Sequence, residues 1–313
     1  MILDDYQIML NAYEEAGGRP SVFKDLRIAH LVVHRERVLA SHSVEGLILN
    51  AKGTDSGVDI DMSVEEGIKI AHPVHLCFGV LPKEGRQQIK INALIKKGGQ
   101  IKILAHCVFP NALRVQHIMD AKIVLEDNAV FCYDEVHYHG LTGGVEVIPT
   151  AEIKIGKGAR LSTNFALTKG RVGRLKIDYR AEVERYGVLE MVTKVYGYGD
   201  DKIKVRESAR LIGEGARGLI KSRMAIREEA QSEVVSELTA CAPNTRGHID
   251  CTEIVQGNAK AKAIPLVDVL HEKAQVTHEA AIGRVNEKQL ETLMAHGLTE
   301  EEATYVIIEG MLK

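Results

Sequence analysis

A small residue follows a glycine or acidic turn at regular intervals along most of this chain. It recurs at Gly99, Ala129, Ala159, Gly187, Ala216, Ala230, Ala259 and Ala274, with gaps of 30, 30, 28, 29, 14, 29 and 15 residues. Each gap is one or two units of about 14.5 residues. A fixed period of short strands and glycine turns is typical of a β-solenoid, in which each coil stacks only on its neighbours. A β-sandwich with irregular strand spacing is the alternative, and the repeat alone does not fix the coil length.

Apolar and polar residues alternate with the period of two that strands have, from about residue 31 to 282. The clearest segments are 33–39, 89–95, 101–105, 121–125, 152–155 and 203–205. The chain therefore divides into an N-terminal helical segment (1–30), a solenoid core (31–283) and a C-terminal helical subdomain (284–313).

Helical signals lie at both ends of the chain. Residues 1–16 predict one helix that stops at Gly17-Gly18, and residues after 284 predict two. In the second region Asn286 with Gln289 forms a cap pair and Gly297 closes the helix, and Thr299 with Glu302 forms a capping box for the next one. The expected apolar stripes are Ile8, Met9, Ala12 and Tyr13 in the first helix, and Ala303, Val306, Ile307, Gly310 and Met311 in the last. The final two helices either cover the open end of the solenoid or dock a partner.

Composition excludes several classes of function. The net charge is −3, only 4% of residues are aromatic and none is Trp, which argues against nucleic-acid binding. No apolar run reaches the roughly 18 residues of a membrane span. The acidic N-terminus is unlike a signal peptide, and five cysteines at irregular spacing suit a reducing cytoplasm.

Two other ligand-rich segments and one glycine motif have simpler interpretations. Residues 213–218 match G-x-G-x-x-G but lie within the repeat, so we interpret them as a solenoid turn. His137 and His139 share one strand face and could hold a metal, or belong to an exposed polar face. His72, His75 and Cys77 are interrupted by apolar packing residues, and Cys107 is expected to be a buried core thiol.

The strongest candidates for chemistry lie in the last quarter. Cys251 is on a predicted strand beside polar residues, and Cys241 lies ten residues earlier. His278 and Glu279 are adjacent on a strand, so only one of them can face a given site unless the backbone turns. A thiol, an imidazole and a carboxylate are all possible iron ligands.

This region resembles the SufB/SufD family of iron–sulfur cluster assembly proteins. The resemblance runs from about residue 190 to 311 and rests on 213–222, Thr245-Arg246, Asp250-Cys251-Thr252, Ile264-Pro265, 277–280, Gln289-Leu290 and Gly297-Leu298, with a weaker echo at 73–79. It implies a right-handed parallel β-helix whose helical C-terminal subdomain docks an ABC-type ATPase, SufC, and which assembles nascent clusters with sulfur from a cysteine desulfurase. Cys251 matches the cysteine that B-type members use for assembly, and His278 and Glu279 match the residues near the same subunit interface. Cys241 has no equally firm counterpart and is a second candidate.

The resemblance also leads to a hypothesis about assembly. Longer members have an extended N-terminal domain, whereas only about 30 residues precede the predicted strands here. A cysteine and a His-Glu pair in one chain look B-like, which suggests a homodimer whose two-fold axis brings two sets of ligands to one transient cluster. The expected function is therefore a cytoplasmic, non-enzymatic scaffold. The alternatives are a D-like adaptor that binds no cluster and a carbohydrate-active solenoid enzyme with paired carboxylates.

Overall fold

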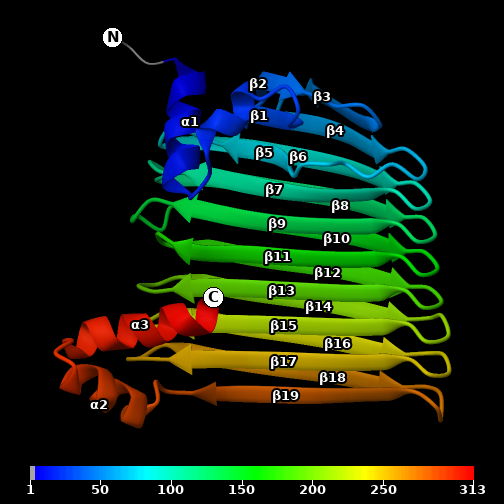
Figure 1. Ribbon diagram of the computed structural model, residues 1–313. Coiled ribbons are helices and arrows are strands. Elements are labelled where there is room, and N and C mark those ends of the chain that lie inside the picture. The colour runs from blue at the N-terminus through cyan, green and yellow to red at the C-terminus, as the bar shows by residue number, and fades with distance from the viewer. Residues whose placement is uncertain (1–3) are drawn as a thin grey trace.

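The computed structural model describes residues 4–313, which form a two-sheet β-solenoid with one helix at its N-terminal end and two at its C-terminal end (Figure 1). Sheet A contains β1 (His30–His34), β2 (Arg37–His42), β5 (Val74–Gly79), β7 (Gln100–Phe109), β9 (Val130–His139), β11 (Arg160–Lys169), β13 (Val188–Gly197), β15 (Arg217–Ile226), β17 (Arg246–Val255) and β19 (Gln275–Gly283). Sheet B contains β3 (Leu47–Gly53), β4 (Gly57–Val64), β6 (Glu84–Ile95), β8 (Arg114–Leu125), β10 (Val145–Ile155), β12 (Arg174–Val183), β14 (Lys202–Leu211), β16 (Gln231–Ala240) and β18 (Lys260–Val269). The predicted mainly-β solenoid with helical ends is confirmed, and the sandwich alternative is wrong.

The strand register fixes the coil that the repeat left open. In sheet A, Gln100 pairs with Val130, Val130 with Arg160, Arg160 with Val188, and Val188 with Arg217. These offsets of 30, 30, 28 and 29 residues equal the first four gaps of the sequence repeat. One coil is therefore 28–30 residues long in this part of the chain and contains two strands, one in each sheet.

The turns explain why small residues mark the repeat. The residue before each of the first five markers has a positive φ: Gly98, Asn128, Gly158, Tyr186 and Gly215. Glycine and asparagine adopt this conformation most readily. The turns also stack closely, because a Cβ added at Gly213 would lie 1.9 Å from the backbone nitrogen of Arg185 in the preceding coil. The 213–218 glycine motif is thus a solenoid turn, as predicted.

The core lies between the two sheets. Alternate side chains of each strand point inward, so that β14, for example, buries Ile203, Val205, Ala209 and Leu211 at every second position. The apolar cluster formed in this way extends through nearly every coil. Burial of this alternating set is what the period-two pattern of the sequence encodes.

The first part of the solenoid departs from the predicted strands. The segment 33–39 is not one strand, because the chain reverses at Arg35, whose φ is +56°, and β1 and β2 form an antiparallel hairpin. β3 and β4 also pair in antiparallel fashion. The two sheets therefore begin with hairpins at their N-terminal edges, and parallel coils follow.

Helix α1 (Asp5–Glu15) covers the outer face of sheet A near its N-terminal edge, followed by the 3-10 helix η1 (Pro20–Lys24) (Figure 1). It buries the predicted Met9, Ala12 and Tyr13 against Val32, Cys77 and Val108. The Tyr13 hydroxyl forms a hydrogen bond of 2.8 Å with Nδ1 of His75. His75 and Cys77 are thus part of a helix–sheet contact.

Helices α2 (Glu287–Ala295) and α3 (Glu300–Leu312) form the expected hairpin. Asn286 caps α2, and Thr299 with Glu302 forms the predicted capping box of α3. The buried residues of α3 are Ala303, Ile308 and Leu312, whereas Val306 and Gly310 of the predicted stripe are exposed. None of the helices within residues 4–313 is long and apolar enough to cross a membrane.

The hairpin does not cover the end of the solenoid. Ile308 and Leu312 pack on Ala225 at the outer face of sheet A, beside Tyr196 and Ile254. Figure 1 shows α3 lying across the end of β15 while β18 and β19 remain at the bottom of the stack. Of the two alternatives, the one in which the hairpin covers the end of the solenoid is wrong, because the apolar face of α3 packs on the outer face of sheet A and leaves the last coil open.

Candidate functional site

Cys251 lies inside the solenoid one coil from its open end. It occupies the middle of β17 and is 1% exposed. Its register partners are Ser222 on β15 and Ala280 on β19, the last strand of sheet A. Since paired residues on neighbouring strands point to the same side, Ala280 is the residue next to the thiol on the side of the open end.

Hydroxyl groups surround the thiol within the core. Ser236 on the facing strand β16 places its Oγ 3.7 Å from the Cys251 Sγ. Burial raises the pKa of the Cys251 thiol above its usual value, and the hydroxyls of Ser222 and Ser236 only partly oppose this effect. Burial therefore favours the protonated thiol, which must lose its proton before it can bind a metal ion.

His278 and Glu279 point to opposite faces of β19. His278 pairs with the inward-facing Ile249, so it lies on the same face as Cys251, displaced by two residues. From the strand spacing and rise, this diagonal separation is about 8 Å between Cβ atoms. Glu279 pairs with Asp250 on the outer face. The structure therefore brings His278, and not Glu279, to the side of the thiol.

Cys241 is far from this group. It is half-buried in the turn after β16, and its Sγ contacts the carbonyl oxygen of Thr239 at 3.9 Å. Cys251 lies five residues beyond the first residue of β17, which is about 17 Å along an extended strand. Cys241 thus lies in the turn at one end of the coil, whereas Cys251 lies in the middle of a strand.

The interior of the last coil is open to solvent. Its inward positions on β18 and β19 are mostly small or apolar, and they are half-buried or exposed: Ala261, Ala263, Pro265, Val267, Val269, Val276, His278, Ala280 and Ile282. Both strands also form the edges of their sheets, so their outer rows of backbone groups have no strand partner within residues 4–313. We name this surface the open end.

Two carboxyl groups near Cys251 were not predicted from the sequence. Glu207 on β14 is 1% exposed and accepts a hydrogen bond of 2.8 Å from Thr193, and burial raises its pKa to about 7. Glu253 is equally buried and accepts a bond of 2.6 Å from Ser232. The alternating pattern could have indicated that both glutamates are buried, because they occupy strand positions at which the neighbouring inward-facing residues are apolar.

An ion pair fixes the outer face behind the thiol. Arg223 makes a bidentate contact with the carboxylate of Asp250, the residue before Cys251, and also donates to the Asp250 carbonyl oxygen. This contact lowers the pKa of Asp250. The backbone of β17 is thus held to β15 on the side opposite the thiol.

The second predicted metal candidate is buried as well. His137 and His139 are each 1% exposed and point into the core, so the exposed-polar-face interpretation is wrong. They belong to the interior because their parity on β9 matches that of Phe131. Cys107 is fully buried, as predicted, and faces the same cluster. His72 is exposed outside β5.

Comparison with known proteins identifies the family. The profile described as "SUF system FeS cluster assembly, SufBD core domain" matches residues 87–311. The chain belongs to the SufBD family. The match extends from β6 to α3 and so includes the Cys251 strand, the open end and the helical hairpin.

Relatives of the SufBD chain match over nearly its full length. An iron–sulfur cluster assembly SufBD family protein of Methanocaldococcus jannaschii is 37% identical over 311 residues, which is 99% of this chain and 98% of the relative. One from Pyrococcus horikoshii is 38% identical over 308 residues, or 98% and 94% of the two chains. The SufB protein of Bacillus subtilis is 27% identical over 135 residues, or 33% and 29%.

Proposed function

We propose that this SufBD protein is a scaffold on which nascent iron–sulfur clusters are built and from which they are transferred. The observation that supports the proposal best is the placement of Cys251 and His278 on one interior face, next to an open end. The cluster is the cargo of the scaffold, and the ligand set is poor in thiolates. Stable clusters are held by four thiolates in most proteins, so a site with fewer thiolates can release its cluster more readily.

The open end fits a second copy of the chain. Unpaired edge strands and an apolar interior are stable only when another surface covers them. A two-fold axis through the open end places two Cys251 and two His278 side chains around one position. The homodimer thus completes a ligand set that a single chain lacks.

Access to Cys251 requires a movement, because the thiol is 1% exposed. The α2–α3 hairpin packs on β15 next to the Cys251 strand, and its exposed residues include Met294, Tyr305 and Val306. We assign this hairpin as the docking surface of a SufC-like ABC ATPase. ATP binding by that partner moves the hairpins and opens the dimer interface.

Sulfur arrives from a cysteine desulfurase in this proposal. The Cys251 thiolate attacks the outer sulfur of the donor persulfide, a new S–S bond forms at Cys251, and the donor thiolate leaves. A two-electron donor, such as a reduced flavin, then reduces the outer sulfur to sulfide and restores the Cys251 thiolate. In the cluster this thiolate would ligate iron, and His278 would contribute a nitrogen ligand. Glu279 faces outward and acts at the interface only if β19 turns.

The decisive experiment measures iron and acid-labile sulfide per chain after anaerobic co-purification with the ATPase. The wild type is compared with Cys251→Ser and with the matched control Cys241→Ser. We expect a cluster spectrum in the wild type and in Cys241→Ser, and its loss in Cys251→Ser with unchanged circular dichroism. Equal cluster content in all three proteins would refute the assignment of Cys251.

The second candidate function is a D-like adaptor without a cluster. The deep burial of Cys251 favours this alternative, since a buried thiol serves packing as well as chemistry. Absence of iron and sulfide from the wild-type complex, together with retained ATPase binding, would support the adaptor.

A further inference from the structure

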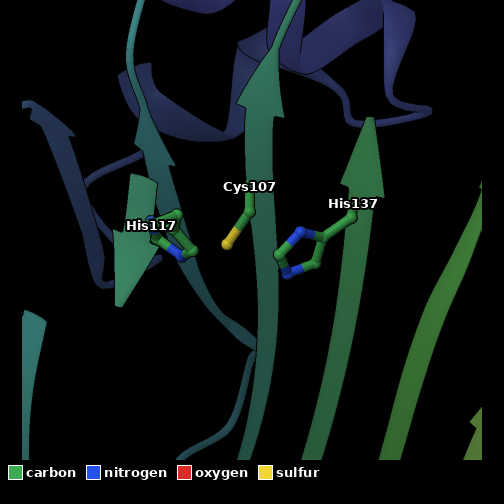
Figure 2. Close-up of side chains that lie close together, drawn as sticks. All are labelled: Cys107, His117 and His137. Carbon is green, nitrogen blue, oxygen red and sulfur yellow. The ribbon is translucent and has the colours of Figure 1, made fainter. Parts of the chain in front are cut away.

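A second group of ligand-type side chains lies inside the N-terminal half of the solenoid. It consists of Cys107 on β7, His117 on β8, and Glu135, His137 and His139 on β9, all at most 2% exposed. Ligand atoms of Cys107, His117 and His137 all lie within 4.8 Å of one another. Figure 2 shows the Cys107 sulfur between the two imidazole rings, which come from separate strands.

The hydrogen bonds of the cluster fix where its lone pairs point. Nδ1 of His139 lies 2.9 Å from the carbonyl oxygen of Arg171, so this nitrogen must donate. Nε2 of His139 therefore carries a lone pair, and it faces Nδ1 of His137 at 3.3 Å. Nε2 of His137 lies 2.6 Å from Oε1 of Glu135.

This geometry puts two nitrogen lone pairs face to face when Glu135 is ionised. The carboxylate then accepts a hydrogen bond from Nε2–H of His137, so Nδ1 of that neutral ring has no proton to donate to His139. Two lone pairs 3.3 Å apart repel each other unless a proton or a cation lies between them. Two ligand atoms of a tetrahedral zinc ion are about 3.4 Å apart when each Zn–N bond is about 2.1 Å.

Unpaired polar atoms point to the same conclusion. Neither ring nitrogen of His117 has a hydrogen-bond partner in the described part of the chain, and Oε2 of Glu135 has none either. A buried polar group left without a hydrogen-bond partner destabilises the folded chain. The His117 ring is 1% exposed, and its centroid is 5.8 Å from that of His137.

We propose that Cys107, His117 and His137 bind one divalent transition-metal ion in the solenoid interior. His139, whose Nε2 lies 3.3 Å from Nδ1 of His137, is the fourth ligand and moves toward the ion when it binds. Glu135 and the Arg171 carbonyl hold His137 and His139 from outside the ligand set, the arrangement by which metal-bound imidazoles are usually oriented. A sulfur and three nitrogens suit zinc, ferrous iron or cobalt, and not magnesium or calcium. The Cys107 thiolate and the Glu135 carboxylate together balance the two positive charges, as a buried ion requires.

The ion has a structural role. Cys107, His137 and His139 belong to sheet A, whereas His117 belongs to sheet B, so the ion links the two sheets across the core. The cluster is separated from Cys251 by the coils of β11, β13 and β15. This inference is therefore independent of the proposed cluster assembly.

The first test is the metal content of the purified chain after dialysis against a chelator, measured by mass spectrometry of the elements. We expect about one zinc or iron ion per chain in the wild type, in Cys132→Ser and in Cys251→Ser. The variants Cys107→Ala and His117→Ala should lose it. Cys132 is the matched control because it lies on β9 but is half-buried on the outer face.

The second test uses cobalt and does not depend on whether the chain keeps its own metal ion during purification. The chain is unfolded, freed of metal, and refolded with one equivalent of Co²⁺. A thiolate-to-cobalt charge-transfer band and tetrahedral d–d bands should appear in the wild type and in Cys132→Ser, and the charge-transfer band should be missing in Cys107→Ala. A refolded wild type without these bands, or with bands that persist in Cys107→Ala, would show that the cluster is a hydrogen-bonded core element without a metal.

Discussion

Cys251 pairs with Ala280 across the last two strands of sheet A, so the methyl group of Ala280 is the side chain next to the thiol toward the open end. A single small residue thus separates a buried thiol from a solvent-exposed surface. This relationship suggests a direct test of whether cargo reaches Cys251 through the open end.

Enlarging Ala280 should close this route. We expect Ala280→Leu to slow the alkylation of Cys251 by iodoacetamide several-fold and to reduce cluster content, because the larger side chain covers the sulfur. The rate is measured by mass spectrometry of the Cys251 peptide. Ala281→Leu is the matched control, since Ala281 pairs with Thr252 on the outer face and should leave the rate unchanged. Equal slowing in both variants would show that the thiol is reached by another route.

His278 and Glu279 should differ in their effects although they are neighbours. His278→Ala should remove most of the cluster, because the imidazole lies on the Cys251 face, whereas Glu279→Ala should retain it. Iron and sulfide are measured per chain as for Cys251→Ser. A larger loss in Glu279→Ala would indicate that β19 turns in the assembled dimer.

Glu207 should make stability depend on pH. Burial raises its folded pKa from 4.5 to about 7, so the folded state binds the proton more tightly than the unfolded state. The resulting contribution of Glu207 to the free energy of unfolding is fully present below pH 4.5. It is lost as the pH rises to about 7, and the loss is roughly 3 kcal/mol at most. Glu207→Gln should flatten this part of the curve and stabilise the protein at pH 8. Urea unfolding at several pH values checks this, with the exposed Glu272→Gln as a control that should keep the wild-type slope.

The Arg223–Asp250 pair should matter more than a similar pair at the surface. The two side chains are 14% and 20% exposed, and Asp250→Asn weakens the contacts that hold Arg223. We expect a loss of about 1–3 kcal/mol in the free energy of unfolding. Arg180 and Asp178 form a comparable bidentate pair with side chains 64% and 30% exposed, so Asp178→Asn should cost under about 1 kcal/mol. Losses of similar size in the two variants would contradict this ranking.

Two substitutions in the α2–α3 hairpin should separate docking of the ATPase from folding of the chain. Val306→Glu should abolish co-purification with the ATPase and leave the melting temperature unchanged, because Val306 is 46% exposed. Ile308→Glu should instead release the hairpin from β15, since Ile308 packs on Ala225. Pull-down and differential scanning calorimetry distinguish the two effects. Retained binding in Val306→Glu would place the ATPase elsewhere.

Local patterns were sufficient to predict most of the fold. The spacing of Gly99, Ala129 and Ala159 matches the coil register, because every coil repeats the same turn and the same alternation. Caps at Asn286 and Thr299 were predictable for the same reason, since a cap depends on residues three positions apart. The hairpin at Arg35 was missed because the alternation of apolar residues continues through the turn.

The candidate sites depended on contacts between coils. Cys251 was identified from its sequence, but its burial and its Ala280 and Ser236 neighbours follow from stacking residues 15 and 29 positions apart. Glu207, His117 and Cys107 gave little local signal, because a polar residue in an apolar position has the same sequence appearance whether it is alone or in a cluster.

The sequence by itself determined the solenoid, the spacing of its turns and its helical ends, since these follow from turn conformations and side-chain alternation along the chain. The coil length of 28–30 residues came from the strand register. Only the tertiary structure decided which polar side chains meet, which face of α3 is buried and which end of the solenoid stays open. The physical reason is that packing between coils and between sheets brings together residues that are too far apart along the chain to influence each other's local conformation.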